Sequence, residues 1–212
     1  MEEQIRACLQ AGADGVEISN GPEILNWLPS PEIVSLLKDK TLTIHAELVG
    51  GVTLDTLAYF IRGLPFTVEN VTFHPDELSE TDLKLLSSLP FKASIENMDV
   101  ARSNWRTVEE VKAVIEPGVG FTLDTAHVQS NDLSISQFAP LFVPVETHLS
   151  NDNSFMYDTY GYKVHHVPTH FTPDDFPDVP RACLIVTLEG VMPNFNALKN
   201  EIDFVKGRLR GE

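Results

Sequence analysis

Short runs of apolar residues recur along the chain, and each run ends in polar or small residues. Seven such runs are expected to be β-strands, at residues 15–19, 42–47, 71–75, 93–98, 121–127, 145–150 and 184–190. Segments with helical spacing or helix-capping signals separate them, at residues 2–10, 31–39, 53–64, 80–89, 107–116 and 194–209. Thr53 and Ser79 are expected to cap helix N-termini, and Gly207 to lie near a helix C-terminus.

The spacing of the strands indicates how they are connected. Successive strand starts lie 22–39 residues apart, the length of a βα unit, which implies parallel strands joined by crossover helices. An open doubly wound sheet is the competing arrangement, but no G-x-G-x-x-G loop and no P-loop occurs. We therefore expect an α/β fold of the TIM type, a (β/α) barrel formed by one domain of residues 1–212.

Polar residues stand in the same register at the ends of six strands: His45, His74, Glu96, Asp124, His148 and Glu189. Because side chains alternate along a strand, the apolar residue before each should face the helices, and the polar residue should lie at the C-terminal mouth. His127, three residues beyond Asp124, is able to join them after the strand turns.

Each of these residues taken singly has an ordinary structural explanation, as a hydrogen-bonded core histidine or a helix-capping carboxylate. Taken together, several carboxylates and imidazoles in one pocket of low dielectric would repel one another and lose solvation unless a cation or ion pairs neutralised them. Too few Lys and Arg stand near these positions for ion pairs to do so. The pattern therefore predicts a divalent-metal site. Mixed nitrogen and oxygen ligands suit Zn, Mn, Co or Fe without selecting among them.

The stretches GADGVEIS, TIHAEL, VTFHPDEL, SIENMD, FTLDTAHVQS, THLSND, HHVP and TLEG occur in this order along nearly the whole chain. As an ordered set they resemble the xylose isomerase-like TIM-barrel superfamily, which includes endonuclease IV, ketose 3-epimerases and sugar-phosphate isomerases or epimerases. The family's first strand has no counterpart before the helix that begins near Glu2, so we expect an incomplete barrel of seven strands.

The resemblance also implies a set of metal ligands. Glu96, Asp124, His148 and Glu189 match the four ligands of the superfamily's shared metal position, and His45 and His74 match two ligands of a second site beside Glu96. His127 and His166 match two ligands of a third metal, although Val164 stands where a carboxylate is expected.

The activity implied by the resemblance is that of a metal-dependent isomerase or epimerase on a small sugar or sugar phosphate. Glu96 and Glu189 resemble the paired acid/base glutamates of the epimerases. Lys163, on the long connection of residues 151–181, and Glu17 are candidates for substrate contact. Two alternatives remain open: an endonuclease IV-like metal-dependent phosphoesterase on abasic DNA, and a non-catalytic metal-binding barrel.

The charge of the chain limits its binding partners, and its cysteine content indicates its cellular compartment. Lys and Arg number 15 against 31 Asp and Glu, and the resulting net charge of −16 repels nucleic-acid backbones and anionic membranes. A small carbohydrate is thus the expected partner, with nucleic acid unlikely and no membrane span. The lone Cys8 and Cys183 and an acidic N-terminus without signal-peptide features fit a cytoplasmic protein. The edges beside the missing strand predict self-association, with a homodimer as the first expectation.

Overall fold

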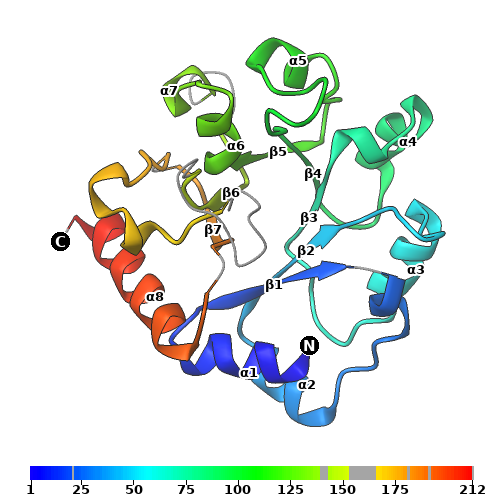
Figure 1. The fold of residues 1–212 in the computed structure, drawn as a ribbon. Helices are drawn as coiled ribbons and strands as arrows, with labels where there is room; N and C mark the ends of the chain where they lie inside the picture. Colours follow the sequence, from blue (N-terminus) through cyan, green and yellow to red (C-terminus); the bar gives the residue numbers. More distant parts are fainter. Residues whose placement is uncertain (21, 139–142, 153–165, 181, 191, 212) are drawn as a thin grey trace. The chain divides into compact units, whose positions relative to one another are not determined.

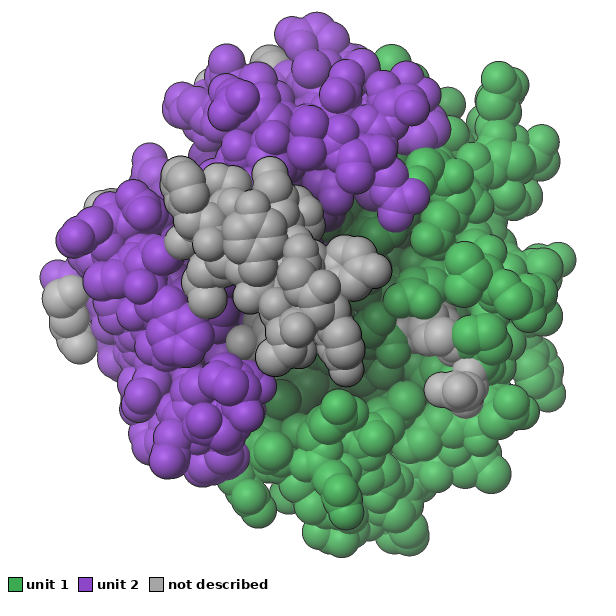
Figure 2. All heavy atoms as spheres, in the orientation of Figure 1, with its two compact units in different colours: residues 1–96, 112–120 green, residues 97–111, 121–212 purple. Residues whose placement is uncertain are grey.

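The computed structural model describes residues 1–211 except 21, 139–142, 153–165, 181 and 191. The chain divides into two compact units, coloured separately in Figure 2. Unit 1 contains residues 1–96 and 112–120, and unit 2 contains residues 97–111 and 121–212.

Strands and helices alternate along the chain (Figure 1). The strands are β1 Gly15–Asn20, β2 Thr41–Ala46, β3 Asn70–Phe73, β4 Ala93–Glu96, β5 Gly120–Asp124, β6 Glu146–Leu149 and β7 Ile185–Leu188. The α-helices are α1 Glu2–Gln10, α2 Pro31–Leu37, α3 Leu54–Gly63, α4 Glu80–Leu85, α5 Val108–Lys112, α6 Thr125–Ser130, α7 Ile135–Phe138 and α8 Phe195–Arg210. Short 3-10 helices are η1 Pro22–Asn26, η2 Pro75–Glu77, η3 Leu86–Ser88, η4 Thr169–Phe171 and η5 Pro173–Asp175.

The strand order in the sheet is β1 to β7, the same as the order along the chain. Strands β1 to β4 pair in parallel within unit 1, and β5 to β7 pair in parallel within unit 2. Parallel strands in sequence order with helices between them have the α/β topology of a TIM-type barrel, with seven strands among the residues that the structure describes. The predicted fold class, an incomplete TIM-type barrel, is confirmed.

The hydrophobic core of unit 1 forms between its strands and its helices. Ile44, Val71 and Ile95, from three neighbouring strands, are fully buried together with Ile33 of α2 and Leu57 of α3. Residues two positions apart on a strand share a face, so one face of this sheet is apolar and packs against the helices. In Figure 1 these helices lie to the outside of the strands of unit 1.

Helix boundaries follow the capping signals in the sequence. Thr53 and Ser79 each form a capping box, because their hydroxyl oxygens accept the backbone N–H of Thr56 and Asp82, whose side chains accept the cap N–H in return. Helix α8 continues through Gly207 and ends at Arg210. Gly211 then adopts a left-handed conformation with φ of 84°, which glycine accommodates without strain.

Six of the seven predicted strands extend past the observed strand ends, and the fifth does so by the most. Residues 121–127 were expected to be extended, but β5 ends at Asp124 and α6 begins at Thr125. The reason is local, because the Asp124 carboxylate accepts a hydrogen bond from the backbone N–H of His127 and so caps the new helix. Over the part of the chain that the structure describes, no helix has both the length and the apolar character needed to cross a bilayer.

Candidate metal centres

Three neighbouring strands of unit 1 bring two imidazoles and one carboxylate together. His45 lies in β2, His74 directly follows β3, and Glu96 ends β4. The Nε2 atoms of the two histidines are 2.8 Å apart, and Glu96 Oε2 lies 3.4 Å from Nε2 of His45 and 3.5 Å from Nε2 of His74. Glu96 is fully buried, whereas the two histidine side chains are 14% and 18% exposed. We call these three residues the unit 1 cluster.

The alternation of side chains along the strands explains why the unit 1 cluster forms. In the parallel register, His45 stands beside Thr72, and Thr72 stands beside Ser94. The side-chain amide of Asn70 donates to Ser94 Oγ at 2.8 Å and to Thr72 Oγ1 at 3.3 Å. These polar groups occupy the face opposite the apolar core, and Glu96, two residues beyond Ser94, continues that face.

Each histidine of the unit 1 cluster has a second carboxylate at its other ring nitrogen. Nδ1 of His45 lies 3.8 Å from Glu17 Oε1, and Nδ1 of His74 lies 3.7 Å from Glu77 Oε1. Glu17, expected at the substrate, is thus found beside a histidine. Glu77 was not among the expected site residues, although the spacing His74-Pro-Asp-Glu77 places a carboxylate three positions after the histidine.

The surroundings of His74 change its acidity. Burial by itself would lower the pKa of His74, but its interactions with the carboxylates of Glu77 and Glu96 outweigh this and raise the pKa to about 10. The interaction with His74 lowers the pKa of Glu77, although burial opposes this shift. Without a bound cation, His74 therefore carries a positive charge at neutral pH.

A metal ion binding at His74 must displace a proton, because only the neutral imidazole is a ligand. We expect Zn²⁺ binding to release protons at pH 7 and to become tighter as pH rises toward 10, by up to about tenfold per pH unit for each proton released. Calorimetric titrations in two buffers of different ionisation enthalpy measure the number of protons released. His74→Gln should release fewer protons than the wild type, and equal release by both would contradict the assignment.

A second group of ligand-type side chains lies in unit 2. Asp124, His127 and His166 each offer one ligand atom within 4.8 Å of the other two, and we call them the unit 2 cluster. Asp124 Oδ2 lies 3.8 Å from His166 Nδ1, and the two imidazole rings are 5.2 Å apart between centroids. His127 Nδ1 lies 2.8 Å from the carbonyl oxygen of Asn97, which leaves Nε2 as the ring atom able to bind a metal.

Asn97, which the sequence analysis did not select, fixes the position of Asp124. Its amide nitrogen donates to the Asp124 carbonyl at 3.0 Å, and its amide oxygen accepts the Asp124 N–H at 2.9 Å. Asp124 and Asn97 are both buried. In the sequence, the only sign of this role is that Asn97 directly follows Glu96 in SIENMD. A local pattern does not show with which residue's backbone the amide will pair.

His166 is held in an unusual backbone conformation. Its φ is 60°, in the left-handed region that non-glycine residues seldom occupy and that costs on the order of 1–3 kcal/mol. The next residue, Val167, forms an antiparallel bridge with Asn151, with hydrogen bonds of 2.8 and 2.9 Å. His166 Nδ1 lies 3.0 Å from Ser150 Oγ and 3.3 Å from Glu189 Oε2. Such strain is typical of positions where the surrounding structure sets a side chain for function.

Glu189 connects two histidines of unit 2. Its Oε1 lies 2.9 Å from Nδ1 of His148, and its Oε2 faces His166. His148 is fully buried, and its Nε2 lies 3.9 Å from the buried carboxylate of Glu146, which accepts a 2.6 Å hydrogen bond from Thr187. His166 therefore lies between Asp124 and Glu189, and Glu189 in turn contacts His148.

The expected metal ligands are divided between the two units. Of the four residues expected at one shared metal, Glu96 belongs to unit 1, and Asp124, His148 and Glu189 belong to unit 2, so this site stays a prediction. His45 and His74 meet Glu96 as expected, and His127 and His166 meet Asp124. Lys163 lies outside the described residues.

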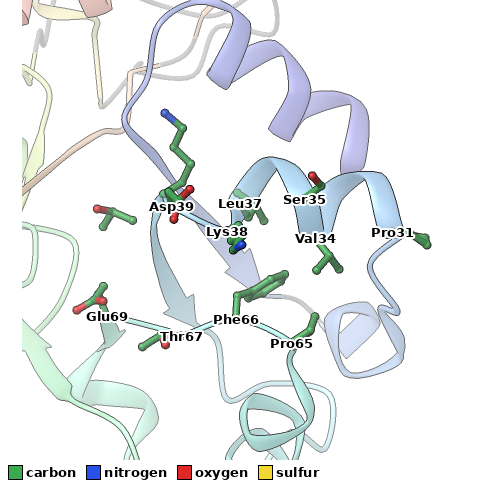
Figure 3. Close-up of a pocket in the computed structure, with 12 residues that line it drawn as sticks. Pro31, Val34, Ser35, Leu37, Lys38, Asp39, Pro65, Phe66, Thr67 and Glu69 are labelled. Carbon is green, nitrogen blue, oxygen red and sulfur yellow. The ribbon is translucent and has the colours of Figure 1, made fainter.

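A groove of about 770 Å³ lies elsewhere on unit 1 (Figure 3). Its walls are α2, the turn of residues 37–41 and the segment of residues 65–69. These segments precede β2 and β3, so the groove lies at the N-terminal ends of the strands, opposite the unit 1 cluster. Lys38, Asp39 and Glu69 on its rim are exposed. Neither histidines nor cysteines are among the residues that line it.

Comparison with known proteins adds no family assignment. No protein-family model matches the chain, and no curated protein matches it. The chain's own residues nevertheless form buried and half-buried groups of His, Asp and Glu that are able to hold a metal ion.

Proposed function

We propose that this protein is a metal-dependent isomerase or epimerase of the xylose isomerase-like superfamily, acting on a small sugar or sugar phosphate in the cytoplasm. The observation that carries the proposal is the unit 1 cluster, in which two imidazole Nε2 atoms converge on the buried carboxylate of Glu96 at the C-terminal ends of parallel strands. Barrel enzymes place their active sites at this end of the strands. The unpaired Cys8 and Cys183 fit a reducing compartment.

The donor atoms of the unit 1 cluster fit a divalent metal. Two neutral imidazoles and one carboxylate form an N,N,O set that Zn²⁺, Mn²⁺, Co²⁺ and Fe²⁺ accept. The two Nε2 atoms at 2.8 Å would repel each other through their lone pairs unless a proton or a cation lay between them. His45, His74 and Glu96 would hold this ion in unit 1.

The reaction requires a proton to leave one carbon of the substrate and to return to the same or a neighbouring carbon. A bound metal supplies Lewis acidity, which polarises the substrate carbonyl and acidifies the adjacent C–H bond. Glu189 is suited to carry the proton, because it is partly exposed and its two oxygens are oriented by His148 and His166. Glu96, in unit 1, is the second candidate for acid/base work.

The charge of the chain supports a small substrate. A net charge of −16 repels the phosphates of a duplex, so it disfavours binding that must neutralise several of them. One observation favours the second candidate, an endonuclease IV-like phosphoesterase: Asp124, His127 and His166 form a further ligand group in unit 2, and hydrolysis at phosphate often uses two or three metals.

Isotope exchange tests the proposed isomerase activity. Protein loaded with Zn²⁺, Mn²⁺ or Co²⁺ is incubated in D₂O with a panel of ketoses, aldoses and their phosphates, and NMR follows exchange at the substrate C–H bonds. We expect exchange and product formation with at least one sugar. Glu189→Gln should lower the rate by at least about a hundredfold, because the amide cannot accept the proton. Glu109→Gln, at an exposed position of α5, is the matched control and should leave the rate unchanged.

The same preparations are incubated with a duplex containing an abasic site at low salt. Cleavage that Glu189→Gln abolishes, without turnover of any sugar, would contradict the isomerase and favour the phosphoesterase. Metal binding without turnover in either assay would favour a non-catalytic metal-binding barrel.

A further inference from the structure

We infer that Glu77 is a positioning residue for the unit 1 cluster: its carboxylate holds a proton on Nδ1 of His74, so that Nε2 is left as the metal ligand. The inference deepens the proposed function and rests on metal binding by the unit 1 cluster. It concerns a residue outside the predicted ligand set.

The turn after β3 brings Glu77 back to His74. His74 precedes the 3-10 helix η2, and its carbonyl accepts the N–H of Glu77 at 3.2 Å. The buried Pro75 occupies the first position of this turn, where its fixed φ suits a helical start. A three-residue separation in such a turn places the two side chains on the same side. Glu77 Oε1 consequently lies 3.7 Å from His74 Nδ1.

The second oxygen of Glu77 is held by the backbone. Oε2 accepts the N–H of Leu48 at 2.8 Å, and Leu48 lies in the loop that follows β2, the strand of His45. The Glu77 side chain is only 19% exposed. The carboxylate is thus fixed at one oxygen by the backbone, and its other oxygen faces the imidazole.

A neutral imidazole carries one N–H, and its neighbours decide which ring nitrogen has it. A carboxylate only accepts hydrogen bonds, so Glu77 favours the proton on Nδ1 and leaves the lone pair of Nε2 directed at Glu96 and His45. Histidines that bind metals commonly donate the other N–H to a carboxylate. His45 has the same arrangement, with Glu17 at its Nδ1 and the cluster at its Nε2. Both histidines of the unit 1 cluster thus have a carboxylate at Nδ1, and this repetition argues against an isolated ion pair at His74 alone.

A purely structural role for Glu77, joining two loops through Leu48, is the competing explanation. Glu77→Gln separates the two roles. The glutamine oxygen is able to keep the hydrogen bond from the Leu48 N–H, but its NH₂ group then faces His74 Nδ1 and donates to it. That contact favours the proton on Nε2, the atom that must bind the metal.

The experiment compares wild type, Glu77→Gln and Glu80→Gln. Glu80 is an exposed residue in the first turn of α4 and serves as the matched control. Zn²⁺ affinity is measured by competition with a chelator, and unfolding of the metal-free proteins by circular dichroism. We expect about 10–100-fold weaker Zn²⁺ binding by Glu77→Gln, and an unchanged affinity for Glu80→Gln. Nitrogen-15 NMR of the Zn²⁺-loaded wild type should show the His74 proton on Nδ1.

The possible outcomes are distinguishable. A wild type that binds Zn²⁺ and a folded Glu77→Gln that binds it equally well would overturn the inference and leave the proposed metal site standing. Weaker binding that is matched by an equal loss of metal-free stability, with the wild-type proton on Nε2, would assign Glu77 a structural role and also overturn it. A wild type that binds no Zn²⁺ would overturn the proposed site and the inference together.

Discussion

Replacement of both His45 and His74 by alanine is expected to remove one bound Zn²⁺ per chain and to weaken binding at that position by more than about a thousandfold. The two imidazoles supply two of the three ligand atoms of the unit 1 cluster, and Glu96 remains as a single oxygen ligand. Loss of an outer carboxylate partner alone costs about 10–100-fold in affinity, so loss of two direct ligands should cost more.

The free energy of unfolding measured with Zn²⁺ should also show the loss of this ion. A ligand at 100 times its Kd stabilises the folded state by about 2.7 kcal/mol, so Zn²⁺ should raise the unfolding free energy of the wild type by that order. The double variant should lose this increment at the same Zn²⁺ concentration. Elemental analysis after dialysis gives the number of ions bound.

The matched control is the pair His127→Ala and His166→Ala, which removes two imidazoles from the unit 2 cluster and leaves the unit 1 cluster intact. This variant should keep the ion bound by His45 and His74. A His45/His74 double variant that is folded and binds as many ions as the wild type would contradict the assignment of the unit 1 cluster.

Glu201→Ala is expected to destabilise the protein by about 3–5 kcal/mol, although the residue lies outside every candidate site. Glu201 is a fully buried carboxylate on α8. Its Oε1 accepts the N–H and the hydroxyl of Thr169 at 2.7 and 2.8 Å, and its Oε2 accepts the N–H and Nδ1–H of His170 at 2.8 and 2.6 Å. Removing the carboxylate leaves the two buried donors of Thr169 without their acceptor, at about 1–3 kcal/mol each, whereas the part-buried donors of His170 are nearer to water and cost less.

Urea unfolding followed by circular dichroism measures this effect. Asp203→Ala is the matched control on the same helix, because Asp203 is 61% exposed and pairs with Lys199 on the surface. That change should cost less than about 1 kcal/mol. Since Thr169 follows His166 by three residues, Glu201→Ala should also weaken metal binding by the unit 2 cluster. Equal stabilities of the two variants would show that the Glu201 carboxylate does not stabilise the segment of Thr169 and His170.

Local patterns in the sequence selected three residues that the structure places close together. His45, His74 and Glu96 were selected because each ends an apolar run, and the C-terminal ends of parallel strands lie at the same edge of a sheet. The structure brings these three residues together at the distances of a ligand group. The outer carboxylate of Glu77 was missed, because only the geometry of the turn at Pro75 shows that it folds back on the imidazole.

The sequence by itself determined the succession of strands and helices, the polar residues at the strand ends and the caps at Thr53 and Ser79. These features depend on periodicity and on hydrogen bonds across a few residues, which neighbouring positions specify. Only the tertiary structure decided the left-handed backbone of His166, its contact with Glu189, and the anchoring of Thr169 by Glu201. Such contacts join residues far apart in the chain, and they depend on how loops and helices pack, which no local pattern of apolar and polar positions specifies.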